Sequence, residues 1–175
     1  MISCWTFPDA EPLLRHASRI AANIAALKHR CVTARVPVIY ANDNSGQWRS
    51  DFKYVVRESL ASEGPGAEIT RQLQPGDEDY FVLKPKHSAF FATPLEILLD
   101  HLKTECLIIT GVAADQCVVN TVADARMRDF KAIVPSDCVA TQSTARQRSA
   151  LRHFEEVLDV RTPRGQHVSL EMKRA

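Results

Sequence analysis

The stretch GVAADQCVVNTVADARMRD, residues 111–129, follows directly on the apolar run CLIIT, residues 106–110. The run predicts a buried β-strand, and the pattern after it predicts a helix over 115–129. Cys117 then lies in or near the first helical turn. Two interpretations of Cys117 are open: a small buried core residue, or a thiolate whose charge the helix N-terminus stabilises.

Strands and helices alternate along the rest of the chain. Further runs rich in β-branched and aromatic residues predict strands at 36–41 (VPVIYA), 80–84 (YFVLK), 131–137 (KAIVPSD) and 156–160 (EVLDV). Apolar spacings of three and four residues predict helices over 13–31, 95–102 and 143–155. The Gly- and Pro-rich stretch 63–79 is predicted to be mainly surface loop. This order predicts an α/β three-layer sandwich with a parallel, Rossmann-like sheet.

Ligands of such sheets bind beyond the carboxyl ends of the strands. That rule selects four candidate segments: 42–48, 84–91, 111–117 and 135–138. Trp48, Phe90 and Phe91 are candidate walls of a substrate pocket, although aromatic residues in such loops are as often part of the core.

Composition excludes several classes of protein. The 175 residues, 45% of them hydrophobic, suit one domain over 1–175. The formal net charge of +1, without a dense basic block, argues against a nucleic-acid partner. No apolar stretch approaches the ~20 residues that span a bilayer, and no signal-peptide pattern opens the chain, so we expect a cytoplasmic protein without a membrane partner. The five cysteines are scattered without C-x-x-C, which suggests neither a disulfide framework nor a zinc site.

Lys84 ends the predicted strand 80–84 and opens the segment KPKHSAF, residues 84–90. Its plain interpretation is a solvated charge at a strand end. The functional interpretation is an ammonium group that stabilises a thiolate and the charge developing on a substrate. Lys86 and His87 are interpreted as surface polarity.

Taken together, GVAADQCV, KPKHSAF and the order of strands resemble the isochorismatase-like cysteine hydrolases, which include isochorismatase, nicotinamidase and N-carbamoylsarcosine amidohydrolase. The resemblance covers most of the chain. It implies that Cys117 is the nucleophile and Lys84 the second member of a triad. It also implies a cis peptide bond between Val112 and Ala113, and an oxyanion hole formed by the backbone N–H groups of Ala113 and Cys117. The threonine usual in this turn is Ala114 here.

The third triad member departs from the family pattern. In the family an aspartate ends a central strand and is followed by M-x-N-D-F, so Met1 matches the residue just after that aspartate. Neither the aspartate nor its strand is in this sequence, and Ser3-Cys4 replaces the N-D pair. Three hypotheses are open: a start assigned too late, a shortened chain, or a degenerate homologue. Three other carboxylates are possible replacements, each more simply a cap or turn residue: Asp9, Asp43 and Asp115.

The resemblance implies a cofactor-free hydrolase, forming a homo-oligomer, that acts on a small amide, carbamoyl or isochorismate-like compound. Relatives with nicotinamidase activity carry D-x-H and further histidines after the second strand, whereas this chain has Asn42-Asp43-Asn44 and no nearby histidine, so we expect no metal. The alternative is a non-catalytic homologue that acts as an oligomeric or small-ligand-binding protein.

Overall fold

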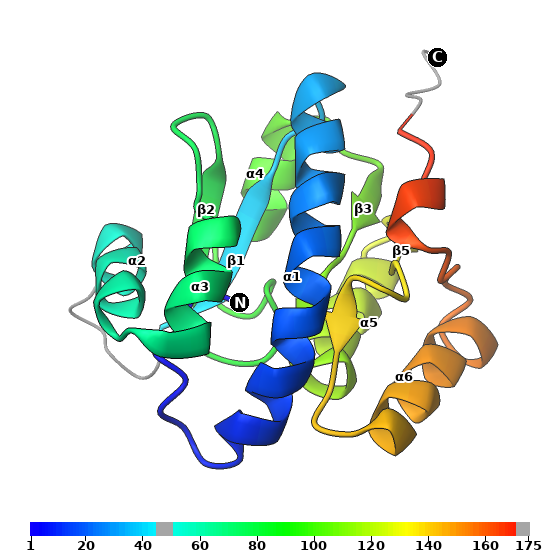
Figure 1. Cartoon of the computed structure of the whole chain (residues 1–175). Helices are drawn as coiled ribbons and strands as arrows, with labels where there is room; N and C mark the ends of the chain where they lie inside the picture. Colours follow the sequence, from blue (N-terminus) through cyan, green and yellow to red (C-terminus); the bar gives the residue numbers. More distant parts are fainter. Residues whose placement is uncertain (45–50, 171–175) are drawn as a thin grey trace.

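The computed structural model describes residues 1–44 and 51–170, which form an α/β fold (Figure 1). The helices are α1 (Ala10–Thr33), α2 (Phe52–Ala61), α3 (Gly64–Gln72), α4 (Leu95–His101), α5 (Val119–Met127) and α6 (Thr144–Glu156), with a π-helical turn η1 (Ala114–Val118) and a 3-10 turn η2 (Gly165–His167). The strands are β1 (Ile39–Asp43), β2 (Tyr80–Lys84), β3 (Cys106–Ile108), β4 (Gly111–Val112), β5 (Lys131–Ile133) and β6 (Val139–Ala140).

Every strand pair in the described residues is parallel, as the alternation of strands and helices predicts. β1 pairs with β2, β3 with β5, and β4 with β6, and Ile133 forms an isolated bridge to Arg161. Within residues 1–44 and 51–170, no strand pairing joins β1 and β2 to the other strands. The pairings thus form three two-stranded sheets. Because β4 follows β3 and β6 follows β5 directly along the chain, we describe β3 to β6 as one group of strands and β1 and β2 as the other.

The helices bury their apolar faces in separate clusters. α1 places Leu13, Ala17 and Ala21 in a cluster that also contains Ala113. α4 and α5 contribute Leu95, Leu99 and Ala125 to a different cluster, together with Val82 of β2. Figure 1 shows α1 in front of the strands and α4 and α5 behind them. Helices thus cover both faces of the strands, which leaves the strand ends for a site.

The first residues of the chain pack between the two strand groups. Ile2 is almost completely buried in the α1 cluster, and Tyr40 of β1 and Val112 of β4 pack against the same cluster. The side chain of Met1 also lies close to Gly111. Figure 1 accordingly shows the N-terminus near the middle of the molecule.

The predicted loop over 63–79 is wrong in part, because α3 forms over Gly64–Gln72. Pro65 fits the first turn of this helix, where no amide donor is needed. Ile69 is buried in the α1 cluster, and Thr70 shares a hydrogen bond with Ser59 of α2. Burial against α1 and α2 therefore outweighs the low helix propensity of the two glycines.

The predicted strand over 156–160 is also wrong. α6 continues to Glu156 and buries Phe154, while Val157 is exposed. Only the bridge between Ile133 and Arg161 extends the sheet in this region. The predicted strand over 131–137 is shorter than expected, since β5 ends at Ile133, two residues before Pro135, which has no amide hydrogen to donate.

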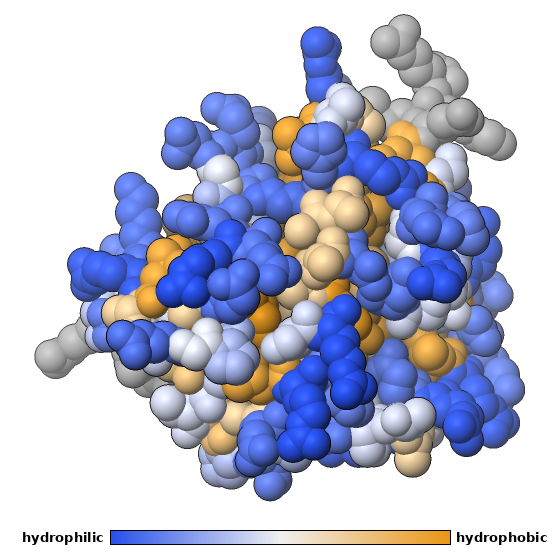
Figure 2. Space-filling model, viewed as in Figure 1, coloured by the Kyte–Doolittle hydropathy of each residue, from blue (hydrophilic) through white to orange (hydrophobic). Residues whose placement is uncertain are grey.

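The described helices include none that is long and apolar enough to cross a membrane. Figure 2 shows hydrophilic residues over most of the visible face, with apolar residues in small groups between them.

Candidate active site

Lys84 and Asp43 meet at the carboxyl ends of β1 and β2. The two residues are direct partners in the parallel register of these strands. Lys84 Nζ lies 3.3 Å from Asp43 Oδ2, and the Lys84 residue is only 5% exposed. The register alone places a carboxylate next to a nearly buried ammonium group.

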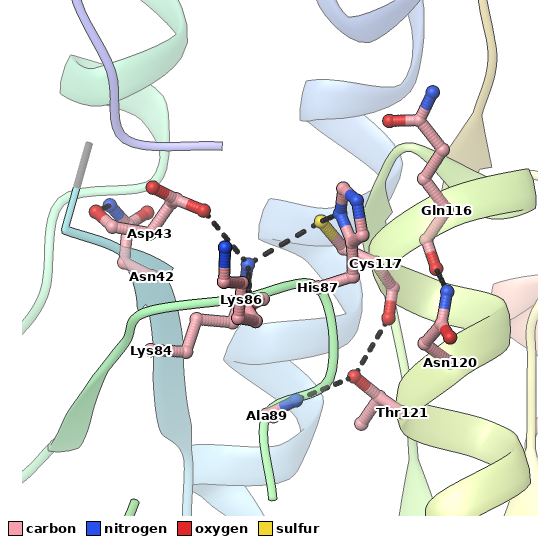
Figure 3. Close-up of polar contacts among 10 residues, drawn as sticks. All are labelled: Asn42, Asp43, Lys84, Lys86, His87, Ala89, Gln116, Cys117, Asn120 and Thr121. Carbon is pink, nitrogen blue, oxygen red and sulfur yellow. Dashed lines mark hydrogen bonds and ion pairs between the residues drawn. The ribbon is translucent and has the colours of Figure 1, made fainter. Parts of the chain in front are cut away.

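The Lys84 ammonium group has three acceptors within reach. Besides Asp43, it donates to the carbonyl oxygen of Lys86 at 3.1 Å and contacts Cys117 Sγ at 3.4 Å (Figure 3). An ammonium group carries three hydrogens and no acceptor, so these contacts use its full donor capacity. A buried charge that is satisfied in this way can persist in the fold, and here it lies directly beside the sulfur.

Cys117 reaches this position from the other group of strands. β4 ends at Val112, the peptide bond between Val112 and Ala113 is cis, and η1 begins at Ala114. The carbonyl oxygen of Ala113 accepts hydrogen bonds from the amides of Gln116 and Val118, which closes the turn. Cys117 lies within this π-helical turn, a conformation found frequently at functional sites. Its side chain is partly exposed, so a substrate can approach the sulfur.

The segment after β2 is fastened to the helix that carries Cys117. The amide of Ala89 donates to Thr121 Oγ1, and this hydroxyl donates to the carbonyl oxygen of Cys117. One turn further on, Ser88 Oγ donates to the carboxylate of Asp124. These bonds fix KPKHSAF against η1 and α5, and Figure 3 shows the segment passing beside the sulfur.

His87 is a site residue that the sequence interpretation missed. Its Nδ1 lies 3.6 Å from Cys117 Sγ, although the residue is exposed. The interpretation of His87 as surface polarity correctly gave its exposure, but it did not include the contact with Cys117. The closeness of KPKHSAF to the cysteine turn, which the resemblance already implied, was the signal that could have found it.

The structure places Phe90 and Phe91, two of the predicted pocket residues, apart from these contacts. Phe90 is buried against Phe130, and its ring is covered by the Arg128 guanidinium. Phe91 is 57% exposed. Trp48 lies outside the described residues.

The three carboxylates considered as replacements for the triad aspartate lie in different places. Asp43 contacts Lys84, whereas Asp115 forms an ion pair with Arg146 at the start of α6. Asp9 precedes α1 and makes no side-chain capping bond. Of these three, Asp43 alone lies in the cluster around Lys84 and Cys117.

The other four thiols have environments that disfavour the thiolate. Burial, and then the carboxylate of Asp137, raise the pKa of Cys138 to about 12. Burial also raises the pKa of Cys31, and partial desolvation raises those of Cys4 and Cys106. Each of the four is less readily ionised than an ordinary thiol.

No group of three or more histidine, cysteine, aspartate or glutamate side chains in the described ranges is arranged to hold a metal ion.

Comparison with known proteins identifies the family. Residues 1–163 match the sequence model of the Isochorismatase domain. The chain belongs to the isochorismatase family. It is 37% identical over 158 residues to the uncharacterized isochorismatase family protein YaaI of Bacillus subtilis, which covers 90% of this chain and 86% of that protein. The assignment places this chain among hydrolases.

Two more distant relatives of this isochorismatase-family chain are named after enzyme activities. It is 31% identical over 140 residues to the isochorismatase of Bacillus subtilis, covering 78% of this chain and 45% of that enzyme. It is 26% identical over 148 residues to the N-carbamoylsarcosine amidase of Arthrobacter, covering 79% and 56%. The chain thus spans about half the length of these two relatives.

Solved structures share the fold. A cysteine hydrolase from Pseudomonas syringae superimposes with a TM-score of 0.74 at 21% identity, covering 94% of this chain and 84% of that one. At this identity the similarity supports the fold alone.

Proposed function

We propose that this isochorismatase-family protein is a cysteine hydrolase that cleaves a small amide, carbamoyl or isochorismate-like substrate at Cys117. The observation that carries the proposal is the contact of 3.4 Å between Lys84 Nζ and Cys117 Sγ. A lysine ammonium group beside a partly exposed thiol favours the thiolate, which is the nucleophilic form. The names of the relatives, amidase and isochorismatase, define the two substrate classes to test.

For an amide, Cys117 Sγ attacks the carbonyl carbon and the oxygen becomes an oxyanion. We assign the oxyanion hole to the backbone N–H groups of Ala113, which lies between β4 and η1, and of Cys117, which lies within η1. Such preorganised donors are typically worth about 10²–10³ in rate. Lys84 stabilises the negative charge that develops at the sulfur and the substrate.

The carboxylate of the Cys–Lys–Asp triad is part of the same proposal. No strand pairing within residues 1–44 and 51–170 joins β1 and β2 to the other strands, and Ile2 is buried between them. Met1 packs beside Gly111 there, and its amino group is electrostatically coupled to Lys84 and Cys117. A residue attached before Met1 would therefore lie close to Lys84 and Cys117, and this is the position that we propose for the triad aspartate.

A substrate panel tests the proposal. Small amides, carbamoyl compounds and isochorismate are offered to the protein and to a Cys117→Ala variant, with Cys106→Ala, an exposed cysteine outside the site, as the matched control. We expect hydrolysis of at least one substrate, lost in Cys117→Ala and kept in Cys106→Ala. Hydrolysis that survives Cys117→Ala would refute the proposal.

The role of the triad carboxylate needs a second comparison. A chain extended before Met1 by an apolar strand ending in aspartate should be more active and more stable to heat than the 175-residue chain. Binding of panel compounds without turnover in both chains would instead favour the non-catalytic alternative, a small-ligand-binding homologue.

A further inference from the structure

The Cys117 sulfur has two polar neighbours of different kinds. Lys84 Nζ lies on one side at 3.4 Å and His87 Nδ1 lies 3.6 Å away (Figure 3). The ammonium group has no lone pair, so it stabilises charge but cannot accept the thiol proton. A neutral imidazole nitrogen can accept it, and histidine exchanges protons readily near neutral pH.

The backbone at His87 is held in place by hydrogen bonds that the residues on either side of it make. The carbonyl oxygen of Lys86 accepts a hydrogen bond from Lys84, and Ser88 Oγ donates to Asp124. Its backbone therefore cannot move away from the sulfur without breaking bonds to β2 and α5. The side chain is exposed, so water and small molecules can reach the imidazole.

We propose that His87 is a catalytic acid–base residue that exchanges a proton with Cys117 Sγ; this rests on the proposed function and assigns its proton transfers. His87 Nδ1 takes the thiol proton as the C–S bond forms at the carbonyl carbon. When the oxyanion collapses and the C–N bond breaks, the imidazolium returns that proton to the leaving amine. Water then attacks the thioester while His87 takes its proton, and the thiolate leaves and is reprotonated by His87.

Other charged groups around His87 bear on any pH profile. Lys84 and Asp43 come from β2 and β1, Lys86 is the preceding residue, and Asp124 on α5 holds Ser88. The amino group of Met1 is also close to Cys117 and Lys84, and burial, followed by the charge of Lys84, lowers its pKa to about 6. A titration near neutral pH must therefore be assigned by substitution of His87.

Alkylation of the thiol tests the proton exchange without any substrate. The rate of Cys117 modification by iodoacetamide is followed from pH 5 to 9 in the protein, in His87→Gln and in His101→Gln, an exposed histidine on α4. We expect His87→Gln to react about tenfold more slowly than the parent protein at pH 7 and below, because no neighbouring base takes the thiol proton. Identical profiles in the two variants would overturn the proposal.

Measurement of turnover distinguishes an acid–base role of His87 from a positioning role. His87→Ala should lower kcat by about 10²-fold or more, and added imidazole should restore part of the loss because the site is open to solvent. Two results would overturn the proposal. One is a folded His87→Ala variant with unchanged kcat. The other is a loss of kcat that imidazole does not restore, combined with an alkylation profile that does not change.

The two proposals fail differently. If Cys117→Ala keeps full turnover, the proposed function is wrong whatever the His87 variants do. If Cys117→Ala is inactive while His87→Ala and His87→Gln behave as the parent protein, only the role of His87 is wrong.

Discussion

Two cysteines in turns next to the paired strands β4 and β6 have opposite surroundings. Cys117 follows β4, is partly exposed, and has the ammonium group of Lys84 at 3.4 Å. Cys138 precedes β6, is 0% exposed, and has the carboxylate of Asp137 at 3.6 Å. The same residue type is thus placed beside a positive charge in one turn and beside a negative charge in the other. The sign of the neighbouring charge and access to solvent, rather than the thiol itself, distinguish a candidate nucleophile from a core residue.

The largest effect should come from removing the positive charge beside Cys117. Lys84→Met keeps a long apolar stem but cannot stabilise a thiolate or an oxyanion, so we expect kcat to fall by about 10²–10³-fold. The measurement is hydrolysis of the best panel substrate, with circular dichroism to verify folding. Lys53→Met, an exposed lysine on α2, is the matched control. Unchanged turnover in Lys84→Met would remove Lys84 from the site.

A smaller effect should follow from changing the carboxylate that faces Lys84. The Asp43 side chain is 52% exposed, so its ion pair is screened by solvent and is worth at most about 1 kcal/mol, or about fivefold. Asp43→Asn should therefore lower turnover by about twofold to fivefold, and less at high salt. A loss of a hundredfold would instead show that Asp43 carries a proton in the reaction.

The smallest effect should lie in the turn of Cys138 and concern stability. Burial acts to raise the pKa of Asp137, but hydrogen bonds from the Gly165 amide and Arg164 outweigh it and hold the pKa below its ordinary value. A lowered folded-state pKa stabilises the fold above the unfolded-state pKa of about 4, and this stability is lost as the pH falls further.

Asp137→Asn should therefore lower the free energy of unfolding by about 1 kcal/mol at pH 7, with the difference from the parent protein shrinking below pH 4. Urea unfolding at pH 7 and pH 3.5 measures it, and turnover at pH 7 should be unchanged. A difference that grows on acidification would have the wrong sign for this mechanism.

The sequence predicted the features that depend on local patterns. Periodic apolar residues located α1, and Ser143 caps α6 as a helix-start residue should. The strand order predicted that the segments after β1, β2 and β4 share one edge of the sheet, where Lys84 and Cys117 are found. The same order predicted a parallel α/β fold, which the strand pairings confirm.

What the sequence did not reveal depends on contacts between distant segments. α3 forms where glycine and proline suggested a loop, because its apolar side is buried against α1 and α2. The closeness of His87 to Cys117 depends on Thr121 and Asp124, which fasten one segment to the other across more than thirty residues. Similarly, no local pattern shows that Asp43 faces Lys84 rather than capping a turn, since this follows from the strand register.

The most direct test of the account is competitive labelling of all five thiols. Limiting iodoacetamide is added to the folded protein at pH 7, and the modified cysteines are identified by peptide mapping. We predict that Cys117 is modified first and that Lys84→Met abolishes its advantage, because the ammonium group favours the thiolate. Labelling that goes first to the exposed Cys4 or Cys106, or to the buried Cys31 or Cys138, would contradict the claim that the surroundings of Cys117 make it the nucleophile.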